Sequence, residues 1–196
     1  MKINFFGDVK PYMRRIILYL TIFTLFFPFG AFGAEIANID ARLINDELIV
    51  TTGLALDDKN LDDLKKGVSK EITIYIDLFR SWKTWPDEFV AGKKIMQVLK
   101  SDPVKDEYIA TSFDGITSTK KRFRDFDSML QWALHIKNLK LINIKELEPS
   151  GYFVRVTAES RIRKLPPVIG YLLFFVPEKE FRVIKDSITF TVGKPK

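Results

Sequence analysis

The sequence predicts a mainly β domain of the α+β class, with about eight strands in an antiparallel, sandwich-like arrangement and two short-to-medium helices. Apolar and polar residues alternate over most of the chain after Ala34, which is the two-residue period of strands with one buried face. Helical spacing occurs in only two segments, and the connections are short, as expected for antiparallel sheets. An apolar N-terminal signal or anchor helix precedes this domain.

That N-terminal segment, residues 1–33, has the layout of a secretory signal peptide. Arg14 and its arginine neighbour precede the apolar run 16–29, and small residues then suit cleavage before Ala34. The alternative is an uncleaved membrane anchor, because the apolar run approaches the length of a spanning helix. In both cases the positive charges precede the apolar segment. We therefore expect 34–196, a single strand-rich domain, to be periplasmic or on the extracytoplasmic face of the inner membrane.

Composition narrows the functional classes further. The absence of cysteine excludes a lipoprotein anchor and disulfides. Removal of residues 1–33 would take away four basic residues and one acidic residue, so the formal charge would fall from +6 to 27 − 24 = +3. This charge is too small to favour nucleic acid as a partner. The remaining segment, 34–196, is long enough to bury a core without disulfides.

The first predicted elements are a hairpin and a helix. Alternation over 39–43 and 48–54, on either side of turn-forming residues, predicts two paired strands. A short helix is predicted over 59–68, with Asp58 or Asn60 as its N-cap. The paired aspartates of this segment lack the ligand spacing of an EF-hand, so we do not expect calcium.

The remaining elements follow the same two patterns. Further strands are predicted over 72–78, 94–100, 108–113, 117–123, 139–147, 152–163 and 181–192. The second helix is predicted over 126–139, with Asp125 or Asp127 as its cap and an apolar stripe that suits packing on a sheet. We expect the strands on either side of the turn at 148–151 to pair as a hairpin.

The segment "LFRSWKTWPDEF", residues 78–89, is a candidate binding surface. Trp82 and Trp85 would stack on a sugar if their faces were open. The interpretation that we favour is a fold corner in which both tryptophans plug the end of the sandwich. Pro86 would fix a turn there, and Asp87 would pair with Arg80. Of the two tryptophans, we expect Trp82 to be the more exposed.

Two other segments are candidates for interaction. The basic residues of the predicted strand 117–123 and its end are Lys120, Lys121, Arg122 and Arg124. We favour a solvated edge strand that is protected by charge, with anionic headgroups or an acidic partner as alternatives. The stretch "PPVIGYLLFFVP", residues 166–177, contains Tyr171, Phe174 and Phe175. It is too short to span a bilayer, and it is either a buried crossover or an exposed apolar loop that contacts a membrane or a partner.

Motifs for catalysis, metal binding or cofactor binding are not found in the sequence. His135 is the only histidine, and the chain has no Gly-x-Ser-x-Gly, His-Glu-x-x-His, phosphate-binding or dinucleotide-binding pattern. We therefore expect no cofactor and no metal. A hydrolase with a pair of carboxylates is the least favoured class, because acids are scattered through the chain.

A Gly-Val pair at the end of a predicted helix is followed by a strand, an Arg, a Trp and an Asp; here these are Gly67, Val68, Arg80, Trp85 and Asp87. The order of these motifs resembles the DUF4390 family, a bacterial family of exported domains of unknown function. The similarity continues through the 108–113 strand, the 126–139 helix and "GYFVRVTAESRIRKLP" at 151–166. It covers residues 36–192, and the stretch 167–180 departs from the common pattern.

The resemblance implies an envelope setting, because many relatives are encoded beside a membrane sensor histidine kinase. It supplies no catalytic residues. The leading hypothesis is therefore a non-enzymatic envelope protein that binds another protein near the inner membrane, with a sensor kinase as the candidate partner. The alternative is a carbohydrate- or lipid-binding module that uses Trp82 and Trp85. Membrane-surface contact is a further expectation, and nucleic acid is not expected.

Overall fold

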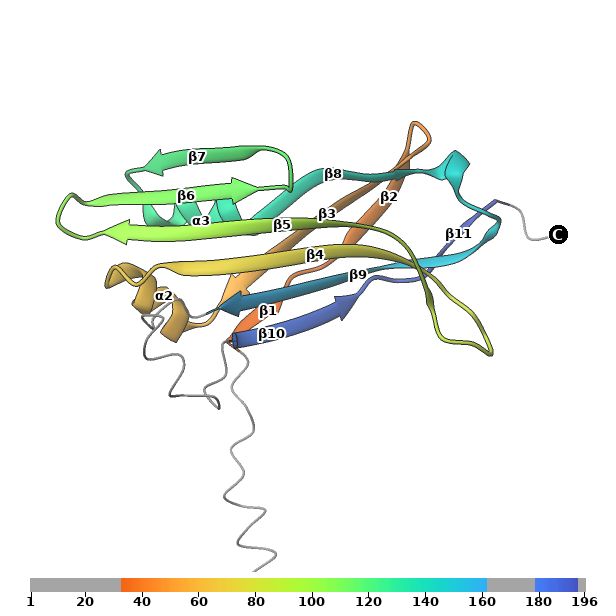
Figure 1. The fold of residues 1–196 in the computed structure, drawn as a ribbon, viewed down its shortest axis with the longest axis horizontal. Helices are drawn as coiled ribbons and strands as arrows, with labels where there is room; N and C mark the ends of the chain where they lie inside the picture. Colours follow the sequence, from red (N-terminus) through yellow and green to blue (C-terminus); the bar gives the residue numbers. More distant parts are fainter. Residues whose placement is uncertain (1–32, 162–178, 194–196) are drawn as a thin grey trace, which may run out of the picture. The chain divides into compact units, whose positions relative to one another are not determined.

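The computed structural model describes residues 33–161 and 179–193, which form two antiparallel sheets and two α-helices (Figure 1). The strands are β1 (Ala34–Ile36), β2 (Asp40–Ile44), β3 (Glu47–Leu56), β4 (Lys70–Arg80), β5 (Glu88–Asp102), β6 (Glu107–Phe113), β7 (Ser118–Phe123), β8 (His135–Asn143), β9 (Ser150–Arg161), β10 (Lys179–Asp186) and β11 (Phe190–Val192). The helices are α2 (Asp58–Lys65) and α3 (Phe126–Leu134), with a 3-10 turn η1 (Ile144–Glu146). The mainly β, antiparallel fold class is confirmed.

The smaller sheet is built around β3. β1 and β2 pair with successive parts of β3, and β8 pairs with β3 as well. The predicted hairpin is confirmed: the two residues between β2 and β3, Asn45 and Asp46, have φ of 51° and 63°. Two positive φ angles in a two-residue turn match the twist of the paired strands.

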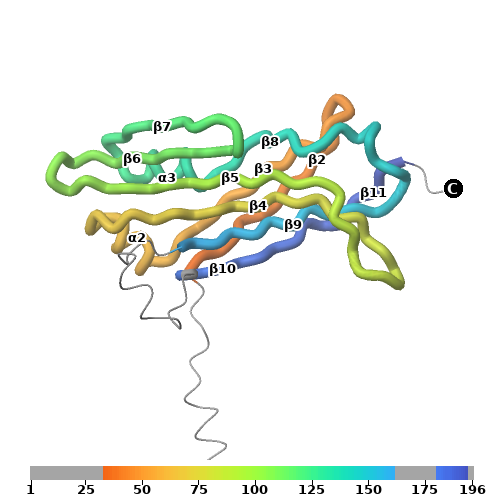
Figure 2. The backbone as a smooth tube through the Cα atoms, in the orientation of Figure 1, coloured from red at the N-terminus to blue at the C-terminus, as the bar shows by residue number. Residues whose placement is uncertain are grey.

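The larger sheet has the strand order β10-β9-β4-β5-β6-β7, and β11 also pairs with β9 (Figure 2). Its centre is β4, in which every second side chain is fully buried. The buried side chains are those of Ile72, Ile74, Ile76 and Leu78. They belong to the same core cluster as Leu48 and Val50 of β3, so the core lies between the two sheets. The alternation in the sequence therefore identified both the strand and its buried face.

Each helix begins at an aspartate N-cap. Asp125 caps α3, where its Oδ2 accepts a hydrogen bond from the Ser128 N–H at 2.7 Å. Asp57 caps α2, one residue before the predicted Asp58, and its Oδ1 accepts from the Asn60 N–H at 2.9 Å. Asn60 is thus inside the helix rather than at its cap. The helix α3 packs on β6 and β7 through the ring pairs Phe126–Tyr108 and Trp132–Phe123.

Three predictions about the second half of the fold are wrong. The helix α3 ends at Leu134, and residues 135–139 belong to β8. β8 pairs with β3, whereas β9 pairs with β4, β10 and β11, so the two strands around 148–151 form no hairpin. The turn η1 carries the chain from one sheet to the other, and adjacency in sequence could not reveal that change. The final strand is also divided into β10 and β11.

The described residues contain no helix that is long and apolar enough to cross a membrane. The expected signal or anchor segment lies outside the described residues except for Gly33. The same holds for Tyr171, Phe174 and Phe175, which lie outside them entirely.

Candidate binding surface at the β4–β5 hairpin

The β4–β5 connection, residues 81–87, extends beyond the neighbouring strands at one end of the larger sheet (Figure 1). β4 and β5 pair along their whole length up to Arg80 and Glu88. The base of the loop is held by a hydrogen bond from the Ser81 N–H to the Gly151 carbonyl at 2.9 Å. The sequence "SWKTWPD" therefore lies at the tip of a long hairpin rather than inside the sandwich.

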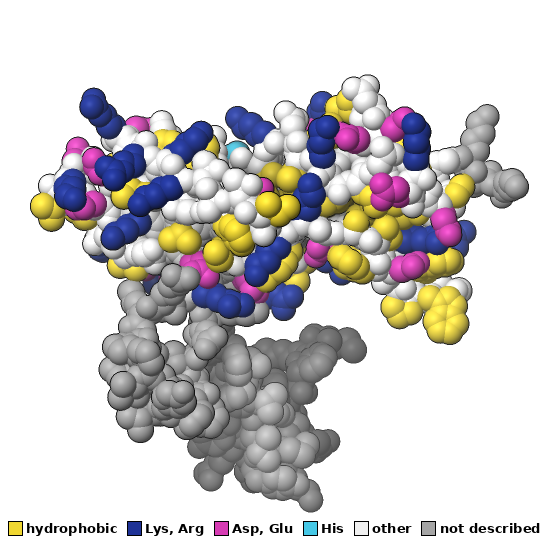
Figure 3. Space-filling view, turned by 45° about the horizontal axis from the view of Figure 1, so that its top comes forward, with side chains coloured by type: hydrophobic (Ala, Val, Ile, Leu, Met, Phe, Trp, Pro, Cys, Tyr) yellow, Lys and Arg dark blue, Asp and Glu magenta, His cyan; other side chains and the backbone are white. Residues whose placement is uncertain are grey.

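Three aromatic side chains of this hairpin are exposed. Trp82 is 42% exposed, Trp85 74% and Phe89 58%. The expectation that the tryptophans plug the end of the sandwich is therefore wrong, and Trp85 rather than Trp82 is the more exposed of the two. The reason is the length of the hairpin, which carries both rings past the core. Figure 3 shows hydrophobic side chains gathered at the projecting end of the molecule.

Trp82 is held in place by its neighbours. The Arg80 guanidinium lies over the Trp82 ring, with Cζ 4.4 Å from the ring centroid, and the indole N–H donates to Glu88 Oε2 at 3.3 Å. Arg80 itself pairs with Glu148 at 2.7 Å and with Glu88 at 3.9 Å. The predicted Arg80–Asp87 pair is not formed, because the strand register places Glu88 opposite Arg80. A guanidinium in this position attracts the ring that it covers and so favours this orientation of Trp82.

A stacked platform of aromatic rings lies beside the hairpin on the outer face of the larger sheet. The Phe79 and Phe153 rings stack at 5.6 Å, and Phe89 meets Phe79 edge to face at 5.9 Å. The Arg155 guanidinium lies over both stacked rings and forms two hydrogen bonds with Asp186, at 2.7 and 2.8 Å. The hydrogen bonds from Arg155 to Asp186 raise the pKa of Arg155. Of the three exposed hairpin aromatics, Phe89 therefore contacts a stacked ring pair that the ion-paired Arg155 covers.

The sequence-based interpretation missed this platform. The outward positions of β4 and β9 include Phe79, Phe153 and Arg155. The alternation in the sequence therefore indicates that these side chains point to the outer face of the sheet. Their stacking depends on pairing between two strands that are far apart in the sequence, which the sequence pattern does not give.

Asp77, opposite Arg155 in the register of β4 and β9, is an acidic group of the same outer face. Its pKa is raised, first by burial, while the nearby Arg155 acts in the opposite direction. Gly92, opposite Asp77 in the register, makes room for this carboxylate: a Cβ at Gly92 would overlap the Asp77 Oδ1. Asp87, which is exposed, also raises the pKa of Arg155, but to a smaller extent than Asp186 does.

The basic candidates lie at the other end of the larger sheet. Lys120, Lys121 and Arg122 are exposed on β7, the terminal strand of that sheet, and Arg124 is exposed just after it. Figure 3 shows Lys and Arg side chains gathered over this end. Arg122 reaches Glu107 at 3.9 Å, and Lys121 lies over the Trp132 ring at 5.0 Å. This placement agrees with a solvated edge strand, and it separates the basic cluster from the hairpin aromatics.

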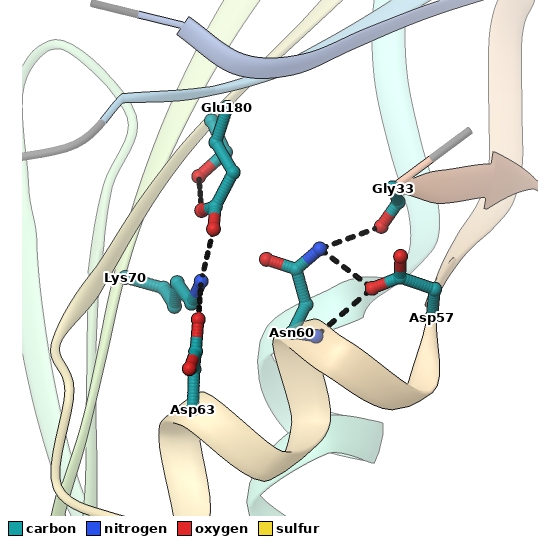
Figure 4. A network of polar contacts seen from close by, with 7 residues as sticks. Gly33, Asp57, Asn60, Asp63, Lys70 and Glu180 are labelled. Carbon is teal, nitrogen blue, oxygen red and sulfur yellow. Dashed lines mark hydrogen bonds and ion pairs between the residues drawn. The ribbon is translucent and has the colours of Figure 1, made fainter. Parts of the chain in front are cut away.

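The buried ion pairs around Lys70 join elements of the fold and are not part of the candidate binding surface (Figure 4). The Lys70 Nζ lies 3.0 Å from Asp63 Oδ2 and 2.5 Å from Glu180 Oε1, and Lys70 is only 3% exposed. Ser160 Oγ donates to the other Glu180 oxygen at 3.3 Å. The network ties α2 to β4 and β10. Within 33–161 and 179–193, no group of three or more His, Cys, Asp or Glu is placed to hold a metal ion.

The sole histidine also has a local role. His135 is exposed at the first residue of β8, where it ends α3, and it lies opposite Gly53 of β3. A Cβ at Gly53 would come within 3.0 Å of the imidazole Cδ2, so the small residue accommodates the ring. Nothing in this arrangement assigns His135 a chemical role.

These observations define an antiparallel two-sheet domain with an exposed aromatic hairpin and a basic edge. The chain belongs to the family described as "Domain of unknown function (DUF4390)", which matches residues 31–189. The resemblance seen in the sequence is thereby confirmed. No curated protein matches the chain, and no solved structure matches it either.

Proposed function

We propose that this chain is a non-enzymatic binding module of the cell envelope, which contacts a partner protein through the hairpin surface of Trp82, Trp85 and Phe89. The observation that carries the proposal is the exposure of these three rings on one projecting hairpin. Large exposed apolar groups are uncommon in such proximity unless they serve contact with another molecule.

The composition of the surface supports a protein partner. Trp and Arg dominate the energetic centres of protein interfaces, and their loss there costs about 2 kcal/mol or more. Here Arg80 fixes Trp82, while Glu88 and Glu148 form a polar rim around the arginine. A fixed ring loses little conformational entropy on binding, which favours affinity. An envelope protein, with a sensor histidine kinase as the first candidate, is the partner class that we propose.

The experiment that tests this function is photo-crosslinking in the cells that produce the protein. A photoreactive amino acid replaces Trp85, and the same replacement at Val104, an apolar residue that is 94% exposed in the β5–β6 turn, is the matched control. We expect a discrete adduct with one envelope protein from position 85 and none from position 104. Identical adducts from both positions, or no adduct from position 85, would contradict the proposal.

A carbohydrate-binding module is the second candidate, and one observation favours it. The Trp85 ring makes no ring or cation contact with any described residue, so its faces are open to stack on a sugar. Titration of the purified chain with soluble peptidoglycan and polysaccharide fragments, followed by isothermal titration calorimetry, separates the two candidates. A saturable change that Trp85→Ala removes would favour the carbohydrate module over the protein-binding module.

A further inference from the structure

The terminal strand β7 and the residue after it form a basic edge, which consists of Lys120, Lys121, Arg122 and Arg124. All four side chains are exposed, and residues 118–124 contain no acidic side chain. Arg122 reaches Glu107 at 3.9 Å, whereas Lys120 and Arg124 form no ion pair with any described residue. The positive charge of the basic edge is therefore largely free to attract an anionic ligand.

The cations of the basic edge surround the strand rather than meet at one point. Successive side chains of a strand point to opposite faces of the sheet. Lys121 lies on the face that α3 covers, where its Nζ is 5.0 Å from the centroid of the Trp132 ring. Lys120 and Arg122 point to the other face. A single small anion needs cations that converge on it, whereas a layer of many anionic groups can contact cations on both sides of an edge.

A further basic side chain joins this end of the sheet from α2. The Lys65 Nζ lies 5.2 Å from the centroid of the Phe126 ring, which meets the Tyr108 ring at 5.3 Å. Tyr108 is in turn opposite Phe123, the last residue of β7. Lys65 is exposed, so the positive surface extends from the basic edge to the end of α2.

Exposed aliphatic side chains lie at both ends of β7. Ile116, in the β6–β7 turn, is 93% exposed, and Val104, in the β5–β6 turn, is 94% exposed. The β5–β6 turn lies past the last residue of β7, because Tyr108 near the start of β6 is opposite Phe123. Basic residues beside exposed apolar side chains are typical of segments that lie on an anionic membrane surface. Protein interfaces instead rely on Trp, Tyr and Arg at their centres.

We propose that the basic edge, together with Val104 and Ile116, binds the anionic surface of a phospholipid bilayer. The cations are complementary to the phosphates of the headgroups, and the two aliphatic side chains enter the layer between them. Each basic side chain near such a surface strengthens binding roughly fivefold, which corresponds to about 1 kcal/mol. β5 runs from the hairpin at Glu88 to the β5–β6 turn at Asp102, so the bilayer and the hairpin surface occupy opposite ends of this strand. Either surface can fail without the other.

The first test measures bilayer contact with an environment-sensitive dye on the full-length chain. The chain has no cysteine, so Ile116→Cys provides a single labelling position, and Thr84→Cys in the exposed hairpin loop is the matched control. The vesicles consist of phosphatidylcholine alone or of an equal mixture with the anionic lipid phosphatidylglycerol. The apolar segment 16–29 is present in both labelled chains, so its own contact with the vesicles is the same in each. We expect at least a threefold rise in fluorescence at position 116 on the mixed vesicles only, and less than a twofold rise at position 84.

The second test reverses charges in the chain that is labelled at position 116. Lys120→Glu with Arg124→Glu removes two cations but leaves the strand charged, so its protection from strand pairing is kept. The matched control, Lys83→Glu with Lys137→Glu, changes the net charge equally at exposed lysines of the hairpin loop and of β8. We expect the first pair to reduce the fluorescence rise on mixed vesicles at least tenfold and the control pair less than twofold. Salt at about 1 M, where the Debye length is about 3 Å, should also abolish the rise.

Four results would overturn the proposal: no rise at position 116, equal rises on the two kinds of vesicle, equal rises at positions 116 and 84, or equal losses in the two pairs of variants. Photo-crosslinking from position 116 in cells covers the other occupant. A discrete adduct with a protein would show that the basic edge binds an acidic partner, and this would also overturn the proposal. If the variant with Lys120→Glu and Arg124→Glu does not fold by circular dichroism, the lipid and salt dependence of the labelled chain without charge reversal decides the outcome.

Discussion

Lys70 provides the sharpest test of the fold, because it is a buried charge between two carboxylates from different elements. Lys70→Met keeps the apolar stem and removes the ammonium group that lies 3.0 Å from Asp63 and 2.5 Å from Glu180. Removal of one partner of a buried ion pair costs roughly 3–5 kcal/mol. The side chains of Asp63 and Glu180 remain 28% and 13% exposed, so solvent screens part of the loss. We therefore expect a decrease of about 3 kcal/mol in the free energy of unfolding.

For a domain of this length, that loss corresponds to a melting temperature roughly 6–12 °C lower. Urea unfolding followed by circular dichroism measures the free energy, and Lys66→Met, at an exposed lysine that follows α2, is the control. A cycle with Glu180→Gln should give a coupling energy of about 1–2 kcal/mol. A loss below about 1 kcal/mol for Lys70→Met, or one equal to that of Lys66→Met, would refute the reasoning.

Three further variants test other parts of the structure. Leu78→Ala should lower the free energy of unfolding by about 3 kcal/mol in urea titrations, because this side chain is fully buried between the sheets. Trp85→Ala should change that free energy by less than about 0.5 kcal/mol, since the ring is exposed; a larger loss would place the ring in the core after all. Asp77→Asn should change the pH dependence of stability. Since the folded-state pKa of Asp77 is raised above 3.8, its stabilising contribution is present below pH 3.8 and is lost as pH rises through the folded pKa. Asp77→Asn should therefore gain stability relative to the wild type between pH 3.5 and pH 7, and equal differences at both values would contradict this.

The sequence predicted those parts of the fold that depend on local patterns. The alternation of β4, the turn at Asn45 and Asp46, and the cap of α3 at Asp125 are each encoded within a few residues. The pairing of β8 with β3 was not predictable in this way. Residues 135–139 continue the apolar pattern of the preceding helix, and only packing against β3 makes them a strand.

The candidate site was predicted in composition but not in geometry. The tryptophans and Arg80 were identified from the sequence, yet the burial of the two tryptophans was predicted wrongly. Whether a Trp-rich turn plugs a sandwich or projects from it depends on how far the β4–β5 connection extends beyond the strands that pair with β4. The register of strands from distant parts of the chain sets that length, and it also brings Arg155 over Phe79.

The position of β9 has a consequence for how the chain folds. Along one edge β4 pairs with β5, which follows it directly in the sequence. Along its other edge β4 pairs with β9, which begins only at Ser150, far along the chain from the end of β4 at Arg80. Domains that depend on such distant strand pairings fold slowly, because the entropy of closing a long loop is lost before any stabilising contact forms. A chain emerging from its N-terminus therefore carries an open β4 edge until residues 150–161 arrive. During that interval, premature pairing with other chains is the main hazard, and a delay in the emergence of β9 should increase aggregation.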